Sequence, residues 1–275
     1  MGIALVANRR SGRGLDPAWL ASMLGGAEIF GLDELVRIAG VDRIVVCGGD
    51  GTIAPVAELA ASLGVPLAVI PGGTANDFAR AHGIPLDPRA AAALAASGET
   101  LRSLELARLS TGRPFVNVAS AGLSSVAARR AAPLKSRFGP LAYGIGAGRA
   151  AISGRPLSVT VSVDDALVFS GRAWQVMVAS SGAFGGGSGI GAADATDGQV
   201  DVVVVPAGSR VALVRRAWGL RTRTIERQRA VPHFAGRVVC VQLPVGTDLN
   251  VDGEFVRGGL ERVTALADAF SLVVG

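Results

Sequence analysis

The segment VVCGGDGT, from Val45 to Thr52, constrains the fold of this chain more than any other. An apolar run typical of a buried parallel strand stops at two glycines, and an aspartate, a third glycine and a threonine follow in a tight turn. The next residues predict a helix that starts near Pro55, because proline suits the first helical turn. Backbone N–H groups and the positive end of the helix dipole would then meet phosphate oxygens. We interpret GGDGT as a phosphate-binding turn; the alternative is a plain strand-to-helix connection.

A second glycine-rich loop supports this interpretation. Leu67 to Ile70 predict another short apolar strand, and PGGTANDFARAHGIP follows, with Thr74, Asn76 and Asp77 ahead of a predicted helix. Two successive parallel strands therefore end in polar loops, and such carboxyl ends line the ligand crevice of an open α/β sheet. Asn76 and Asp77 have an alternative role as simple helix N-caps.

The predicted elements change character at about residue 104. Before it, strands alternate with helices predicted at 17–24, 32–39, 55–63 and in DPRAAAALAAS, which is the pattern of a nucleotide-binding α/β half. After it, strands dominate, apart from helical segments predicted around 124–130, 141–152 and 210–220. RPFVNVAS and RVVCVQLP are among the segments that read as single strands. The pattern predicts an α/β part followed by a β-rich part.

GGDGT at Gly48–Thr52 followed by PGGTANDFAR at Pro71–Arg80 resembles the diacylglycerol kinase, sphingosine kinase and bacterial lipid kinase family. Three further segments continue the resemblance in the same order: FVNVASAGLSSVAAR, GAFGGGSGIGAADATDGQVDVVVV and VDGEF. The resemblance implies a Rossmann-like nucleotide domain of the NAD kinase and diacylglycerol kinase type over residues 1–104. It implies a β-sandwich-like lipid-substrate domain over residues 105–265, with residues 266–275 packing back on the first domain.

The resemblance also implies that the nucleotide is ATP. The first loop, ANRRSGRG, stands where the family has NPxSG, with Arg9 in place of the proline, and it lacks the GxxxxGK[ST] pattern of a Walker A loop. The residues expected at the ATP phosphates are Asn8, Ser11, Gly12, Gly48, Gly49, Asp50, Gly51, Thr52, Thr74, Asn76 and Asp77.

Phosphoryl transfer needs a metal that neutralises the phosphates and a carboxylate that accepts the proton of the attacking hydroxyl. Asp50, in the phosphate loop, is expected to organise a catalytic Mg²⁺. Glu254, in VDGEF, is assigned as the general base by resemblance. Asp252-Gly253 is also a strong type I′ hairpin signal, and both interpretations hold together if the turn presents the glutamate.

An acidic turn, DATDGQ, supplies a second metal candidate. Asp194 and Asp197 lie three residues apart with a glycine after the second, and hard cations prefer such oxygen ligands. A simple turn entering the next strand is the alternative. The resemblance favours a structural Mg²⁺ site formed by Asp194, Asp197 and the backbone carbonyl of Gln199.

Some residues depart from the family pattern. Ala54 and Pro55 stand where the family usually has an asparagine and a glutamate, and Glu105 stands where an aspartate is expected. The expected function is an ATP- and Mg²⁺-dependent lipid kinase that phosphorylates the hydroxyl of diacylglycerol or a related lipid. The alternatives are a sphingoid-lipid kinase, an NAD kinase, whose second motif differs from PGGTANDFAR, and a catalytically weak lipid- or nucleotide-binding protein.

Charge suggests where such an enzyme works. Lys and Arg number 27 against 22 Asp and Glu, and clusters at 129–137 and 215–229 mix arginines with large apolar residues. These clusters fit an anionic membrane surface and fit a solvated helix face equally well. Nucleic acid is disfavoured, because aromatic residues make up only 5% and no nucleic-acid module is recognised.

Compartment and partners follow from the apolar segments. No apolar run approaches the ~20 residues that span a bilayer, and MGIALVANRR is too short for a signal peptide. Cys47 and Cys240 lie inside apolar runs, which suits a reducing cytoplasm. We expect a cytoplasmic protein, peripheral at the inner membrane face, that meets a lipid substrate; homodimerisation is left open.

Overall fold

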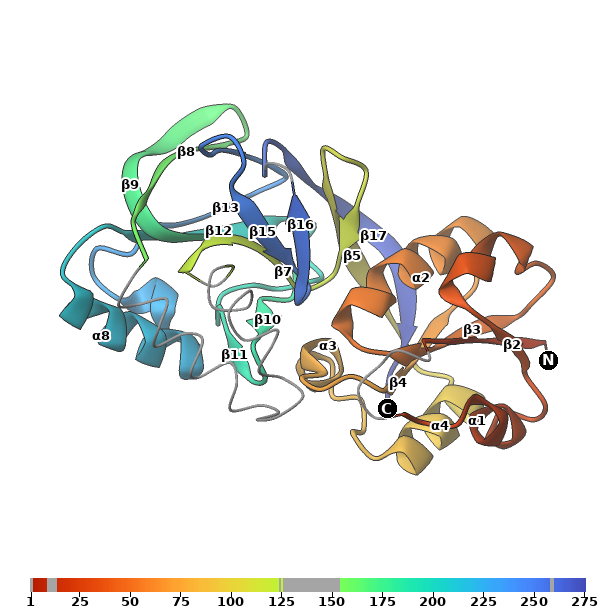
Figure 1. Cartoon of the computed structure of the whole chain (residues 1–275). Coiled ribbons are helices and arrows are strands. Elements are labelled where there is room, and N and C mark those ends of the chain that lie inside the picture. Colours follow the sequence, from red (N-terminus) through yellow and green to blue (C-terminus); the bar gives the residue numbers. More distant parts are fainter. Residues whose placement is uncertain (1, 9–13, 124, 126–153, 258–259) are drawn as a thin grey trace.

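The computed structural model describes residues 2–8, 14–123, 125, 154–257 and 260–275. Within them, 15 strands join in one mixed sheet, whose main path runs β16-β15-β7-β9-β8-β14-β17-β4-β3-β1-β2. Figure 1 shows this sheet passing from a strand-rich half into a half where helices flank the sheet. No helix in the described ranges has the length and apolarity to cross a membrane.

The N-terminal half is built on four parallel strands, β1 (Ile3–Ala7), β2 (Glu28–Phe30), β3 (Arg43–Gly48) and β4 (Leu67–Pro71). The apolar runs of β3 and β4, and nearly all of β1, are buried on both faces, as central parallel strands require, whereas β2 is a partly exposed edge strand. Helix α2 (Asp50–Leu63) covers one face, and α1 (Pro17–Met23) and α4 (Pro88–Ser97) cover the other (Figure 1). The carboxyl ends of these strands, which carry the predicted phosphate loops, therefore lie along one edge of this three-layer unit.

Two predicted helices differ in the structure. Helix α2 begins at Asp50 and not near Pro55, because Gly49 takes an extended conformation and acts as the N-cap. The aspartate, glycine and threonine of GGDGT therefore form the first helical turn. The helix predicted over 32–39 is a 3-10 helix, η1 (Leu32–Arg37), which ends where Ile38 turns into an extended conformation and enters the core.

The second half is antiparallel and rich in strands (Figure 1). Its strands are β7 (Val118–Gly122), β8 (Leu157–Val163), β9 (Ala166–Ala179), β12 (Val200–Pro206), β13 (His233–Gly236), β14 (Val238–Gln242), β15 (Asp248–Val251) and β16 (Glu254–Arg257), with a separate small pair, β10 (Ala183–Phe184) and β11 (Ser188–Gly189). This half also contains helix α8 (Arg210–Arg221) and the 3-10 turn η3 (Ile225–Arg227), whereas the short helix α3 (Asp77–Ala81) follows β4 in the N-terminal half.

Several details of this half differ from the expectation. The predicted strand RPFVNVAS is interrupted and forms β6 (Pro114–Phe115) and β7, because the backbone N–H groups between them bind a carboxylate described below. Strand β13 was not expected. The helices predicted around 124–130 and 141–152 lie outside the described residues, apart from isolated positions.

One strand pair connects the two halves. β5 (Leu101–Leu109) runs antiparallel to β17 (Val263–Val273) along nearly its whole length. The end of β17 then joins the parallel strands, where Leu272 pairs with Leu67 of β4. The division of the chain at residue 104 and the separate tail at 266–275 stay predictions, since β5 and β17 cross both boundaries as continuous strands.

Candidate active site

The two glycine-rich loops pack against each other backbone to backbone. The Gly72 N–H donates to the Gly48 carbonyl at 2.8 Å. A Cβ added at Gly73 would lie only 2.6 Å from the Cα of Gly49, which is closer than real contacts allow. Glycine is required here because two loops share the space that one side chain would fill.

The loop that follows β1 is tied to the GGDGT turn by a side-chain hydrogen bond. Asn8, directly after β1, donates from Nδ2 to the Thr52 hydroxyl at 3.1 Å, and its backbone N–H donates to the Cys47 carbonyl. Asn8 and Thr52 therefore lie together at the ends of neighbouring parallel strands. The other predicted residues of the first loop, Ser11 and Gly12, and the substituted Arg9 lie outside the described residues.

Asn76 has a structural task inside the second loop. It takes a left-handed conformation (φ 52°) and exchanges two hydrogen bonds with Gly73, from the Gly73 N–H to Oδ1 at 2.8 Å and from Nδ2 to the Gly73 carbonyl at 2.9 Å. Asn76 precedes α3 without a side-chain capping bond. Its amide shapes the loop, whereas Thr74 is exposed and open to a ligand.

Asp50 lies where three elements meet. Its Oδ1 accepts from the backbone N–H of Phe78 at 2.8 Å and from Nδ2 of Asn117 at 3.2 Å. The Asn117 Oδ1 in turn accepts from the Ser181 hydroxyl at 2.6 Å. Both bonds to Asp50 use Oδ1, so Oδ2 has no protein donor among the described residues. That oxygen is available to a cation or to water.

Asp77 links the nucleotide half to the second half. The side chain is buried, and its carboxylate accepts from the backbone N–H groups of Gly186 at 2.9 Å and Gly187 at 3.0 Å. Burial raises the pKa of Asp77, and the charge of Asp50 raises it further. Because the Asp77 carboxylate binds N–H groups of the second half and none of α3, the alternative of simple helix capping is wrong for Asp77.

The VDGEF segment forms the predicted tight hairpin between β15 and β16. Asp252 and Gly253 both have positive φ (48° and 86°), as a type I′ turn requires. The buried Asp252 carboxylate accepts from three successive backbone N–H groups, at residues 116–118. Burial raises the pKa of Asp252 to about 7, and Asp50 adds to the shift. The hairpin is thereby fixed beside the Asp50 cluster.

Glu254 is presented by this hairpin to the first turn of α2. Its carboxylate accepts from Arg113 Nη2 at 2.6 Å, and its side chain is 54% exposed. A Cβ added at Gly51 would lie 2.5 Å from Glu254 Oε1, so the carboxylate packs directly on the glycine next to Asp50. Glu254, one of the two predicted catalytic carboxylates, thus contacts the glycine that follows the other, Asp50, in the chain.

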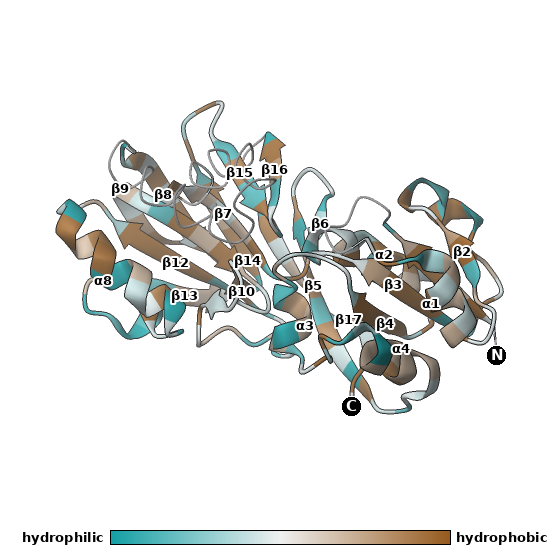
Figure 2. Cartoon of the chain, turned by 60° about the horizontal axis from the view of Figure 1, so that its bottom comes forward, coloured by the Kyte–Doolittle hydropathy of each residue, from teal (hydrophilic) through white to brown (hydrophobic). Residues whose placement is uncertain are grey.

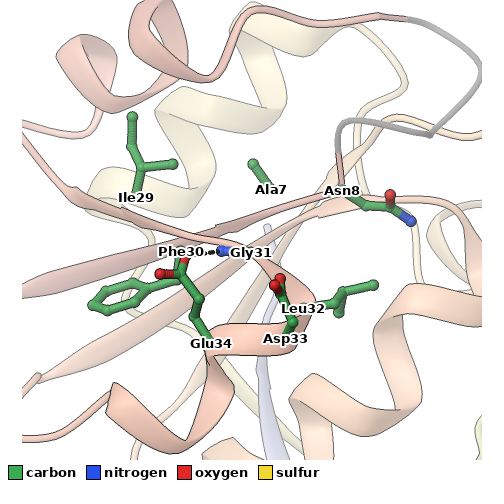
Figure 3. Close-up of a pocket in the computed structure, with 8 residues that line it drawn as sticks. All are labelled: Ala7, Asn8, Ile29, Phe30, Gly31, Leu32, Asp33 and Glu34. Atoms are coloured by element: carbon green, nitrogen blue, oxygen red, sulfur yellow. Dashed lines mark hydrogen bonds between the residues drawn. The ribbon is translucent and has the colours of Figure 1, made fainter.

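Two cavities flank these groups. One of about 650 Å³ lies beyond the ends of β1 and β2 and is lined by Ala7, Asn8 and the segment 29–34 (Figure 3). The other, of about 320 Å³, opens between α2 and the β15–β16 hairpin. Its lining combines Leu32, Leu35, Gly51, Ala54, Pro55, Arg113, Pro114, Val251, Asp252 and Glu254. Ala54 and Pro55, which depart from the family pattern, therefore form an apolar wall beside Glu254.

The acidic turn lies away from these cavities. Asp194 Oδ1 accepts from the N–H and the hydroxyl of Thr196, and Asp197 Oδ1 accepts from the Gln199 N–H. These bonds form the turn that was the alternative to a metal site. Burial raises the pKa of Asp197, and the nearby charges of Asp201 and Asp194 add to it.

Glu105 adds to the negative charge near this turn. Its side chain is 2% exposed, and neither carboxylate oxygen has a hydrogen-bond partner of normal geometry in the described residues. Burial raises its pKa to about 7, opposed by the nearby Ser180 hydroxyl and Gly198 N–H and assisted by Asp197. The described residues contain no cluster of three acidic, histidine or cysteine side chains that would hold a metal. The expected set offers two carboxylates and one backbone carbonyl, which are oxygen ligands of the kind that a hard cation takes.

Three groups that hold the carboxylates of the site were not expected from the sequence. Asn117 and Arg113 hold the two carboxylates, and the backbone of Gly186 and Gly187 holds Asp77. Asn117 and the two glycines lie inside segments that carried the family resemblance, so their motifs gave a signal. Arg113 lies outside those segments, and only the fold brings it to Glu254.

The two halves match separate family models. Residues 31–109 match the diacylglycerol kinase catalytic domain. Residues 117–274, more than half of the chain, match the YegS C-terminal NAD kinase beta sandwich-like domain. The chain belongs to the family of diacylglycerol kinases and YegS-like lipid kinases. The predicted combination of a Rossmann-like nucleotide domain and a β-sandwich-like domain is confirmed.

Individual relatives agree with this family. A Bacillus subtilis (strain 168) protein named diacylglycerol kinase is 33% identical over 225 residues, which cover 80% of this chain and 72% of the relative. A Pseudomonas aeruginosa (strain PAO1) protein named "Probable lipid kinase YegS-like" is 47% identical over 113 residues, and there the match spans only 36% of the relative. A crystal structure of a Bacillus anthracis (strain Sterne) diacylglycerol kinase shares the fold, with a TM-score of 0.78, 23% identity, and coverage of 100% of this chain and 97% of that one.

Proposed function

We propose that this diacylglycerol kinase family member is an ATP- and Mg²⁺-dependent lipid kinase that phosphorylates the hydroxyl of diacylglycerol or a related lipid. The observation that carries the proposal is the contact between Glu254 and Gly51. It places an exposed carboxylate against the glycine-rich turn that begins α2, within the same turn as Asp50. A proton acceptor beside a phosphate-binding turn is the arrangement that phosphoryl transfer to a hydroxyl needs.

The nucleotide would occupy the edge of the parallel sheet. The backbone of Gly48–Thr52, with the exposed Thr74, would hold the phosphates at the start of α2, where N–H groups and the helix dipole favour negative charge. The 650 Å³ cavity next to Asn8 has the size for the nucleoside. When bound, ATP supplies the phosphoryl group and Mg²⁺ neutralises its charge. Asp50, through Oδ2, is the residue that would hold that cation.

The acceptor would enter by the smaller cavity. Glu254 lines it together with Leu32, Leu35 and Pro55, so a carboxylate lies among apolar side chains. Such a wall suits an alcohol attached to hydrocarbon better than a sugar hydroxyl of a dinucleotide. Arg113 donates to the Glu254 carboxylate and orients it, and a general base must be held in position beside the hydroxyl. We place the acceptor at the cytoplasmic face of an anionic membrane.

A second cation would bind the acidic turn. Asp194, Asp197 and the carbonyl of Gln199 are the proposed ligands, supported by the nearby buried Glu105 carboxyl, whose two oxygens have no hydrogen-bond partner of normal geometry among the described residues. Its role would be structural, because the turn lies against the strands that join the two halves.

The test is transfer of labelled phosphate from ATP to a panel of diacylglycerol, sphingosine, ceramide and NAD, with and without Mg²⁺. We expect diacylglycerol to be the best acceptor and Asp50→Asn to lose transfer with an unchanged melting temperature, since Asn keeps the shape and removes the charge. Transfer to sphingosine or NAD instead would replace the substrate class. An absence of transfer to every acceptor would favour a catalytically weak binding protein.

A further inference from the structure

The larger cavity contains a carboxylate to which the proposed chemistry gives no task. Asp33 lies in the first turn of η1, shortly after the end of β2, and its exposed side chain lines the 650 Å³ cavity. In Figure 3, Asp33 stands between Asn8 on one side and Ile29 on the other. Within the described residues, no hydrogen bond or ion pair engages the Asp33 carboxylate. Both of its oxygens are therefore open to a bound molecule.

The neighbouring carboxylate on the cavity lining is already engaged. Glu34 Oε2 accepts from the Gly31 N–H at 2.9 Å, and Glu34 Oε1 accepts from Arg37. Figure 3 shows the Glu34 side chain turned back to this N–H group. Glu34 thus closes the first turn of η1, whereas Asp33 faces the cavity without a structural partner.

Gly31 determines where the Asp33 carboxylate lies. A Cβ added at Gly31 would be 2.5 Å from Asp33 Oδ1, so the carboxylate takes the space that a side chain would fill. The φ of Gly31 is −83°, a conformation open to any residue. Glycine is therefore needed here for the carboxylate and not for the backbone.

The distance from the phosphate-binding turn suits a ribose. The parallel strands β3 and β4 are hydrophobic along their length (Figure 2), so polar groups for a ligand come from the segments that follow the strands. β1 pairs with both β3 and β2, which puts the ends of β3 and β2 two strand spacings, about 10 Å, apart. In a nucleotide the ribose follows the phosphates directly, and the base lies one sugar further. Beyond Asp33, the partly exposed Ile29 offers an apolar surface to that base.

We propose that Asp33 makes the nucleotide site selective for ribonucleotides by accepting hydrogen bonds from the 2′ and 3′ hydroxyls of the ATP ribose. An ionised carboxylate can only accept, and two O–H donors on adjacent carbons match its two oxygens. An acidic residue after the second strand has this role in dinucleotide-binding Rossmann folds. The inference rests on the proposed nucleotide site and adds a discrimination to it: a deoxyribose leaves the carboxylate unpaired, and a ribose 2′-phosphate is repelled by it.

The experiment compares the affinities of ATP, 2′,3′-dideoxy-ATP and ITP by calorimetry in Mg²⁺, without a lipid acceptor. ITP keeps the ribose and lacks the amino group of adenine. Wild type should bind ATP at least about tenfold more tightly than the dideoxy nucleotide, because hydrogen bonds to a charged group are among the strong ones. In Asp33→Ala this ratio should fall to within about twofold, since the hydroxyls and the carboxylate act through one contact. The ratio is the readout because losing Asp33 also removes a charge that repels the triphosphate.

Two further variants separate position from charge. Gly31→Ala keeps the carboxylate but displaces it, so the ratio should fall as it does in Asp33→Ala. The matched control is Glu28→Gln, which removes an exposed carboxylate at the start of β2, outside the cavity lining, and should keep the wild-type ratio. Melting temperatures should match the wild type in Asp33→Ala and Glu28→Gln, because both side chains are exposed.

The outcomes distinguish this inference from the proposed kinase activity. A wild-type ratio near one, or an unchanged ratio in Asp33→Ala, would overturn the inference. So would a loss of discrimination between ATP and ITP in Asp33→Ala with the dideoxy ratio intact, because the carboxylate would then bind the base. Ribose selectivity that depends on Asp33, without phosphate transfer to any lipid, would support the inference and remove the proposed function.

Discussion

At the scale of single residues, this site is a chain of contacts around Asp50. Asn117 joins Asp50 to Ser181, and Asp252 fixes the backbone on which Asn117 stands. The carboxylates differ in what they do. Asp77 binds backbone N–H groups of the second half and so joins the two halves, and Asp252 binds the N–H groups of residues 116–118 and fixes its hairpin within the second half. Glu254 is half exposed and lies at the surface of the site. The distinction lies in burial and partners, not in residue type.

The first prediction concerns Glu254. Glu254→Gln keeps the size of the side chain and its contact with Gly51 but removes the basic carboxylate. Turnover of the lipid acceptor should fall on the order of 10²- to 10⁴-fold, the usual contribution of a positioned base. ATP binding, measured by calorimetry, should be unchanged. Glu58→Gln is the matched control, because Glu58 also pairs with an arginine, Arg108, and lies outside the catalytic cluster.

A wild-type rate in Glu254→Gln would move the base elsewhere, with Asp50 as the first candidate. Loss of ATP binding would instead make Glu254 part of the metal-nucleotide site.

The motif residues could be predicted from sequence because glycines and carboxylates in GGDGT and VDGEF have local signatures. The residues that bind these carboxylates could not be predicted from the sequence. Arg113 reaches Glu254 from 141 positions away, and nothing in the local sequence around Arg113 distinguishes it from the other surface arginines. Asn76 shows the reverse case: a motif residue expected at ATP whose amide bonds to its own loop.

At the scale of elements, the start of α2 controls the geometry of the site. The sequence predicted this helix but placed its start near Pro55, because proline is favoured in a first turn. An extended Gly49 begins the helix earlier, so Pro55 lies inside the helix, where it has no N–H to donate to the Gly51 carbonyl one turn before it. That shift puts Asp50 and Gly51 on the helix itself, and Gly51 there contacts Glu254.

The second prediction uses Gly51. Gly51→Ala would place a Cβ 2.5 Å from Glu254 Oε1 and force the carboxylate away. Turnover should fall at least about tenfold, while stability should stay level or rise by up to about 1 kcal/mol, because alanine favours helix over glycine. The measurement is kinetics and thermal unfolding of the same samples. In a Glu254→Gln background the same change should cost little further activity, because the two residues act through one contact. Additive losses would contradict the assignment.

The third prediction concerns the pairing of β12 with β13. His233 Nε2 lies 2.5 Å from Asp201 Oδ1, and this hydrogen bond raises the pKa of His233 above its usual value of about 6.5. The folded state therefore binds the proton more tightly than the unfolded state does. The resulting stability is fully present below pH ~6.5 and is lost as the pH rises through the raised pKa.

His233→Gln should consequently lower the melting temperature at pH 6 more than at pH 9. His82→Gln would not serve as a control variant, because burial lowers the pKa of His82 to about 4 and its ring packs at a tilt against Phe78. The same melting-temperature difference at both pH values would show that the pair is not protonation-linked.

At the scale of the whole molecule, few contacts set how the two halves meet. β5 and β17 run through both as one antiparallel pair, and the buried carboxylate of Asp77 adds hydrogen bonds to the Gly186 and Gly187 N–H groups of the second half. The sequence showed that there are two parts but not this connection, because long antiparallel pairing between residues 101–109 and 263–273 leaves no local pattern. The acidic turn lies at the same junction: Ala195 accepts from the Glu105 N–H of β5 at 2.9 Å, and a Cβ added at Gly198 would lie 3.0 Å from Ala267 of β17.

The fourth prediction follows from that position. A cation bound by Asp194 and Asp197 would stabilise the strand pair that joins the halves, so nucleotide-free protein should unfold at a higher temperature in Mg²⁺ than in a chelator. A ligand at 100 times its Kd contributes about 2.7 kcal/mol to folding. Asp194→Ala should abolish the increase, whereas Asp165→Asn, which removes a carboxylate from another exposed turn, should keep it. An equal Mg²⁺ response in wild type and Asp194→Ala would mean that this turn is held by its own hydrogen bonds and binds no metal.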